Sequence, residues 1–211
     1  MALFIRLFLF SFPFLFLNSP EISNTKIIQQ NIRQQNNNWK KITTKQNISF
    51  LFPNNAEVKK NVAYKMPSVI YQTKDMVCVY GVVCSDFSNL KEVFYHENID
   101  NMYKILKEAS IKEANANFVS ERTIKENDLK IREIKYTLMN SGYEMTYIKR
   151  FIFRAPYIYQ ISIGARTRNT EYLNNRGMIF FNSIRFFEKS EVKTAIKDTL
   201  KIKKEENNGK E

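Results

Sequence analysis

Histidine, cysteine and glycine are scarce in this chain of 211 residues, which contains one, two and five of them. Acid–base and nucleophilic catalysis commonly use a tunable imidazole. The single histidine, His96, lies beside Glu97 in the segment FYHEN, where a local hydrogen bond or an exposed loop position accounts for it. Composition alone leaves a serine–histidine–aspartate arrangement open. The G-x-S-x-G, H-E-x-x-H and glycine-rich phosphate-binding motifs do not occur. We therefore expect no enzyme and no cofactor or metal site.

The two cysteines, Cys78 and Cys84, are six residues apart in the segment CVYGVVC. If this segment is one strand, both side chains lie on the same face and are separated by about 20 Å. A disulfide needs Cα atoms roughly 5.5–6 Å apart. Nothing in the chain has the spacing of zinc ligands. We expect two buried free thiols.

Residues 1–20 form an apolar leader. A short start with one cation is followed by an apolar run, Leu7 to Leu17, and by the break Asn18-Ser19-Pro20. Eleven helical residues span about 16 Å, whereas the hydrocarbon core of a bilayer is about 30 Å thick. The run therefore predicts a signal peptide and an extracytoplasmic protein, periplasmic or secreted. Because a small-x-small cleavage pattern is missing, an uncleaved N-terminal anchor remains the alternative.

Basic residues outnumber acidic ones, 33 to 21, which gives a formal net charge of +12. Such a charge favours anionic partners, whether nucleic acid, an acidic protein or an envelope component, and allows association with a membrane surface. The basic residues are scattered with carboxylates nearby, however, so a solvated mixed surface is the alternative interpretation. The segments KIREIKY and YIKRFIFR interleave cations with aromatics, as nucleic-acid platforms do. However, most of their aromatics alternate with Arg150 and Arg154, and we expect Lys149 to reach solvent at a strand end. No nucleic-acid partner is expected.

The chain divides into four parts. A polar linker at 21–38 follows the leader, one folded domain spans 39–187, and a charged tail covers 188–211. The tail is either a thin amphipathic helix or a frayed end. Apolar periodicity within the domain predicts helices at 98–114 and 170–183. Alternating patterns predict strands at 47–53, 62–72, 76–85, 118–125, 129–138, 143–153 and 157–164.

Three local irregularities are expected in the strands. Gly81 indicates a bulge or a close packing contact. The apolar positions change parity between Ile131 and Ile134, which indicates a bulge or twist there. In the strand at 143–153, tyrosines and phenylalanines alternate with a polar set, which is typical of a half-buried antiparallel strand.

The domain opens with Trp39 and Ile42 and with Phe50–Pro53, places its central helix before three strands, and closes with the segment FFNSIRF. This order of elements resembles the PsbP-like family. The family includes the extrinsic oxygen-evolving subunit of photosystem II, and a Ran-binding import factor shares its fold. The resemblance implies an α+β fold in which an antiparallel β-sheet is flanked by α-helices, an α/β/α sandwich. It also implies a noncatalytic role.

Two functions follow as hypotheses. The first is an exported noncatalytic module that binds a protein partner or supports an envelope assembly. Its candidate partner surface is a basic outer face made of Lys130, Arg132, Arg150, Arg154, Arg166 and Arg168. The alternative is a carrier or sensor of an apolar small ligand held between sheet and helix, because tyrosine and phenylalanine are abundant in the strands at 143–153 and 157–164.

Overall fold

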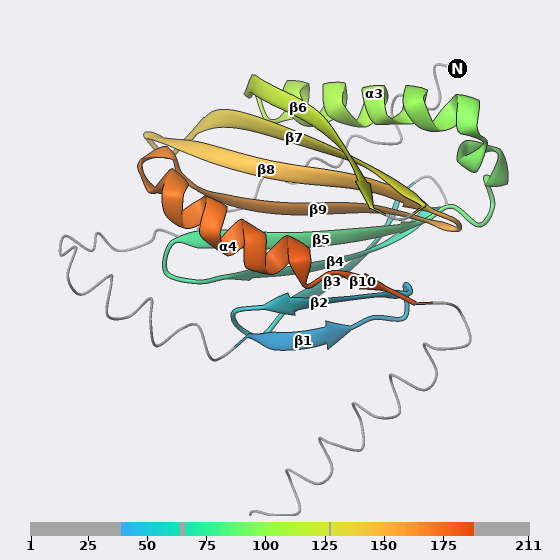
Figure 1. Cartoon of the computed structure of the whole chain (residues 1–211), viewed down its shortest axis with the longest axis horizontal. Helices are drawn as coiled ribbons and strands as arrows, with labels where there is room; N and C mark the ends of the chain where they lie inside the picture. The colour runs from blue at the N-terminus through green and yellow to red at the C-terminus, as the bar shows by residue number, and fades with distance from the viewer. Residues whose placement is uncertain (1–38, 64–65, 127, 188–211) are drawn as a thin grey trace, which may run out of the picture.

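The computed structural model describes residues 39–63, 66–126 and 128–187 (Figure 1). The predicted leader, linker and charged tail lie outside these residues. The helical segments are η2 (Lys91–Phe94), α3 (His96–Glu113), η3 (Thr167–Asn169) and α4 (Thr170–Asn182). The strands are β1 (Lys40–Thr43), β2 (Ile48–Phe52), β3 (Glu57–Ala63), β4 (Met66–Lys74), β5 (Cys78–Asp86), β6 (Asn117–Glu126), β7 (Leu129–Asn140), β8 (Tyr143–Arg154), β9 (Tyr157–Arg166) and β10 (Arg185–Phe186).

These strands form two antiparallel sheets. The larger sheet has seven strands in the order β3-β4-β5-β9-β8-β7-β6, and the smaller has three in the order β1-β2-β10. Helix α3 packs on one face of the larger sheet, and α4 packs with the smaller sheet on the other (Figure 1). The predicted α+β class, an antiparallel sheet flanked by helices, is confirmed. The small second sheet was not predicted.

The larger sheet is buried on both faces, which explains the change of parity in β7. Ile131 packs into the core on the α4 side and Ile134 into the core on the α3 side. Of the bulge or twist predicted between them, the bulge is absent, because the ladder with β8 runs without interruption from Ile131 to Asn140. The register shift lies instead in the edge strand β6, between Phe118 and Ser120.

Strand β8 is likewise covered on both faces rather than half-buried. Its expected polar face contains Thr146 and Ile152, each only 1% exposed. Gly81 forms no bulge, since it pairs in regular register with Gln72 on one side and Ser162 on the other. A sheet sandwiched between two layers therefore shows weaker alternation than a sheet with one face in water.

The predicted strands and helices are otherwise confirmed within a few residues at each end, with one exception. The strand expected at 62–72 joins the end of β3 to most of β4. The sequence EVKKNVA of β3 is rich in charge because β3 is an edge strand, and residues 57–60 are exposed. Charged edge strands limit unwanted pairing between chains, but their alternation is hard to read in a sequence.

Candidate functional site

A buried ion pair joins the β4–β5 turn to helix α4. Arg176 Nε lies 3.5 Å from Asp75 Oδ2, and the two side chains are 2% and 1% exposed. The Tyr80 hydroxyl donates to the same Asp75 oxygen at 2.8 Å. Arg176 Nε also donates to the Tyr172 hydroxyl at 2.9 Å. The other Asp75 oxygen accepts from the backbone N–H groups of residues 77 and 78, at 2.8 and 2.6 Å.

This network fixes local structure. The Arg176 guanidinium also lies 5.2 Å from the ring centroid of Trp39, the first residue of the described domain. The network therefore holds together the start of the described domain, the β4–β5 turn and α4. Neither residue was proposed from the sequence, because Asp75 occupies a turn and Arg176 falls within the apolar stripe of α4. A cation on an otherwise apolar helical stripe is the signal that could have found the pair.

A second polar cluster lies beneath the C-terminal half of α3. Lys149 of β8 is 8% exposed, and its Nζ lies 3.2 Å from Ser110 Oγ of α3. The rings of Tyr136 and Phe151 lie about the same ammonium, with centroids at 6.0 and 5.9 Å. Burial away from water lowers the pKa of Lys149 from 10.5 to about 8, while the nearby Glu113 carboxylate acts in the opposite direction. The expected position of Lys149 in solvent at a strand end is wrong.

Replacing Lys149 by methionine is expected to stabilise the protein at pH 7 by about 1–3 kcal/mol, because burying the charge costs free energy. The folded-state pKa is lower than the unfolded one, so the unfolded chain binds more protons between pH 8 and 10.5. The stability of the wild type should therefore rise with pH in this window relative to the variant. Urea unfolding between pH 7 and 9.5 measures both effects.

The exposed Lys125→Met variant serves as the control, since it removes the same charge from solvent. It should stay within about 0.5 kcal/mol of the wild type over the whole range. A Lys149→Met variant that is less stable than the wild type at pH 7 would show that Lys149 contributes a net favourable ion pair there.

The six basic residues predicted as one outer face are divided among three places, so the structure corrects that geometry. In the register, Arg132 pairs with Phe151 and Arg150 pairs with Glu133. The two arginines therefore point to opposite faces of the sheet. The alternation at 143–153 predicted one polar and one apolar face, whereas both faces of the sheet carry cations over packed aromatics.

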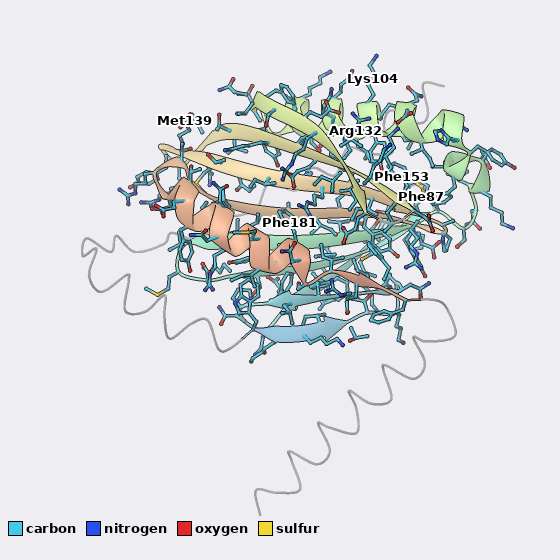
Figure 2. The ribbon with its side chains drawn as sticks, viewed as in Figure 1. Phe87, Lys104, Arg132, Met139, Phe153 and Phe181 are labelled. Carbon is cyan, nitrogen blue, oxygen red and sulfur yellow. The ribbon has the colours of Figure 1, made fainter. Side chains whose placement is uncertain are left out.

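Two of the six, Lys130 and Arg132, lie on the α3 side. Lys130 Nζ is 2.6 Å from Asp100 Oδ1, and Arg132 Nη1 is 2.8 Å from Glu121 Oε1. Lys107 of α3 also bonds Glu121, at 2.8 Å. These pairs fasten α3 to β6 and β7, and Figure 2 shows Arg132 below the helix.

Arg150 and Arg154 lie on the α4 side. Arg150 Nε is 2.7 Å from Glu133 Oε2, and its guanidinium lies 4.0 Å from the ring centroid of Phe181. The guanidinium of Arg154 lies 5.4 Å from the ring centroid of Phe186. Both arginines thus pack against the closing segment of the domain, which leaves them poorly placed for a partner.

Arg166 and Arg168 lie at one end of the larger sheet, beside a hairpin that projects from it. Strand β6 pairs with β7 only up to Thr137, and β9 pairs with β8 only up to Met145. The last residues of β7 and the first of β8 therefore pair with each other and with no third strand of the described sheet. This tip carries Met139, 68% exposed, and Tyr143, 40% exposed.

The β4–β5 turn lies at the same end, because Cys78 of β5 pairs with Ala165 of β9. It contributes Met76, 44% exposed, and the exposed Lys74. The Arg166 guanidinium stacks on Tyr143, 3.7 Å from the ring centroid. Two exposed carboxylates, Glu144 and Glu171, are also at this end. We name as the exposed end the residues Lys74, Met76, Met139, Tyr143, Arg166 and Arg168; Figure 2 shows Met139 there.

The remaining candidates from the sequence take ordinary positions. His96 is the exposed first residue of α3. Both thiols are free and buried, as predicted, and burial raises their pKa. Within the described ranges, histidine, cysteine and acidic side chains form no group able to hold a metal. No helix in those ranges combines the length and apolar character needed to cross a bilayer.

The aromatic residues that suggested an apolar ligand pack on one another. Tyr136 and Tyr147 stack with centroids 5.4 Å apart, and Tyr103 meets Phe153 edge-on at 4.6 Å. A Cβ atom added to Gly164 would lie 2.3 Å from the Tyr147 ring. The aromatic excess in these strands is therefore accounted for by core packing.

No family model and no curated protein matches the chain. Among solved structures, the chain is similar to cyanobacterial PsbP (CyanoP) from Synechocystis sp. PCC 6803, at 12% identity and a TM-score of 0.51. That match covers 71% of this chain and 93% of the other. The chain therefore has a PsbP-like fold, which confirms the resemblance seen in the sequence.

Two other solved structures are similar at lower scores. PA94 from Pseudomonas aeruginosa, a protein of unknown function described as a putative regulator, is 11% identical with a TM-score of 0.39, covering 66% of this chain and 91% of that one. LpqN, involved in cell envelope biogenesis of Mycobacterium tuberculosis, is 10% identical with a TM-score of 0.41, covering 76% and 97%.

Proposed function

We propose that this protein is an extracytoplasmic, noncatalytic module that docks on an anionic component of the cell envelope through the exposed end. One observation carries the proposal: exposed apolar side chains gather at this end of the sheet with cations that form no ion pair within the described residues. Met76, Met139 and Tyr143 lie there with Lys74 and Arg168. Exposed apolar side chains beside cations are typical of interaction surfaces.

The polar groups elsewhere support a binding role over a catalytic one. Asp75 and Arg176 bond to each other and to neighbouring tyrosines. Lys130, Arg132 and Arg150 bond to carboxylates that fasten helix to sheet or strand to strand. These groups serve the fold. The apolar leader and the net charge of +12 favour an envelope location and an anionic partner.

Charge reversal tests the proposal. The double variant Arg166→Glu/Arg168→Glu is expected to bind envelopes isolated from the native host several-fold more weakly than the wild type, because surface charges steer and hold an oppositely charged partner. The difference should shrink at high salt, where charges are screened. Sedimentation of purified full-length protein with these envelopes measures the effect.

The matched control is Lys41→Glu/Lys60→Glu, which changes the net charge equally at exposed positions of β1 and β3. This control should retain nearly all binding. Equal losses in the two double variants would show that only total charge matters and would remove the exposed end from the proposal. Circular dichroism would verify that each variant is folded.

A further inference from the structure

We infer that the exposed end binds the surface of an anionic lipid bilayer, with Met139 and Tyr143 of the β7–β8 hairpin entering the headgroup region. This inference rests on the proposed function and names its partner. The hairpin has the required shape, because beyond Thr137 and Met145 its two strands are flanked by neither β6 nor β9. A projecting tip can enter an interface while the sheet behind it remains in water.

The side chains at the tip fit an interface between water and lipid. Met139 is 68% exposed on the α4 side of the sheet, and Tyr143 is 40% exposed on the α3 side. They lie on either side of the polar turn Asn140-Ser141-Gly142. Tyrosine rings are enriched at headgroup level, where the ring is buried and the hydroxyl stays hydrated. Apolar side chains on both faces of a narrow tip favour end-on insertion over docking of one face on a protein.

The cations are placed to meet lipid headgroups when the tip inserts. Arg166 stacks on Tyr143 and pairs in register with Met145, immediately behind the tip. Arg168 and Lys74 are exposed at the same end. Basic residues near an anionic leaflet each strengthen binding about fivefold. Glu144 and Glu171 oppose this attraction, so the selectivity for anionic lipid depends on the cations and the overall charge together.

The path of the chain agrees with this orientation. Trp39, the first described residue, lies against Arg176, which pairs with Asp75 in the β4–β5 turn. The described domain therefore starts near the β4–β5 turn, which is part of the exposed end. The apolar run Leu7 to Leu17 precedes Trp39 by about twenty residues. If this run enters a membrane during export or afterwards, the connecting chain leads to the end that we assign to the bilayer.

A fluorescent probe at the tip tests the assignment at the residues that would enter the bilayer. Ser141→Cys places one reactive thiol in the turn, since the native Cys78 and Cys84 are each 1% exposed. Full-length protein labelled there with an environment-sensitive dye is mixed with vesicles of phosphatidylcholine, with or without phosphatidylglycerol. We expect a blue shift with phosphatidylglycerol, and its loss at high salt because charges are then screened.

Two controls locate the effect. Ser88→Cys places the dye at the opposite end, where the backbone N–H of Phe87 donates to the Pro156 carbonyl of the β8–β9 turn. This probe should not respond. Adding Met139→Asp and Tyr143→Asp to the Ser141 probe should abolish its shift, whereas adding Val58→Asp, an exposed apolar position on β3, should leave it unchanged.

Equal responses from the Ser141 and Ser88 probes, or silence from the Ser141 probe, would overturn the bilayer assignment. In that case the charge-reversal experiment still decides the proposed function. Loss of envelope binding on Arg166 and Arg168 reversal, with a silent tip probe, would point to an acidic protein at the exposed end. Retention of envelope binding together with a silent probe would remove both proposals.

Discussion

Replacing Arg176 by methionine is expected to lower the free energy of unfolding by about 3–5 kcal/mol, a large part of the stability of a typical domain. The side chain is 2% exposed, and its partner Asp75 is 1% exposed. Removal of the cation leaves the Asp75 carboxylate buried, with hydrogen bonds from the Tyr80 hydroxyl and two backbone N–H groups. Those bonds offset only part of the cost of burying a charge. Urea unfolding of the full-length protein measures the loss.

A double-mutant cycle separates the ion pair from the loss of packing. Asp75→Asn/Arg176→Met should be less destabilised than the sum of the two single variants, because neither charge is then left alone. Lys104→Met, an exposed change on α3 (Figure 2), should alter stability by less than about 0.5 kcal/mol. Additive effects of the two single changes would mean that the pair contributes nothing beyond shape.

The fold was predictable where the signal is local. Helix α3 shows its buried face as Met102, Tyr103 and Leu106, which recur at three- and four-residue spacing. The β7–β8 turn was predictable from Gly142, whose φ of 81° suits glycine. Tertiary context decided the rest. The change of parity between Ile131 and Ile134 was interpreted as a bulge or twist, because the sequence does not reveal that helices cover both faces of the sheet.

The candidate site was harder to predict, because it depends on which strands are neighbours. Arg166 and Arg168 were proposed as partner-binding residues, but together with Lys130, Arg132, Arg150 and Arg154. Only the strand order shows that the first pair lies at an open end of the sheet. Lys130, Arg132 and Arg150 form ion pairs within the fold, and Arg154 packs against Phe186. The projection of the β7–β8 tip follows from where β6 starts and β9 ends. No local pattern records either fact.

The two faces of the larger sheet and its exposed end have different roles. Helix α3 covers one face, and α4 with the small sheet covers the other, so both faces of the larger sheet are part of the core. Interaction is then left to strand ends and turns. On such a scaffold a binding role can be carried by few residues, because the packed sheet holds them in place. The proposed docking through Met139, Tyr143 and Arg166 has this character.

Replacing Gly164 by alanine is the second change for which we expect a large effect, a loss of about 3 kcal/mol. Gly164 pairs in register with Tyr147 on the next strand. An added Cβ would lie 2.3 and 2.4 Å from two ring carbons of Tyr147. The ring is only 2% exposed and stacks on Tyr136 at an interplanar angle of 11°, so rotation away from the clash would disturb the α3-side core.

A second glycine and a second-site change make this prediction specific. Gly177→Ala places its Cβ 3.7 Å from Ile163, an ordinary contact, and should stabilise α4 by about 0.5–1 kcal/mol. In a Tyr147→Leu background the clash is removed, so Gly164→Ala should cost little there although Tyr147→Leu itself is destabilising. Thermal unfolding of the four combinations at positions 147 and 164 gives the coupling. If Gly164→Ala is equally harmful with leucine at 147, the cost arises from the backbone of β9 and not from the aromatic ring that covers it.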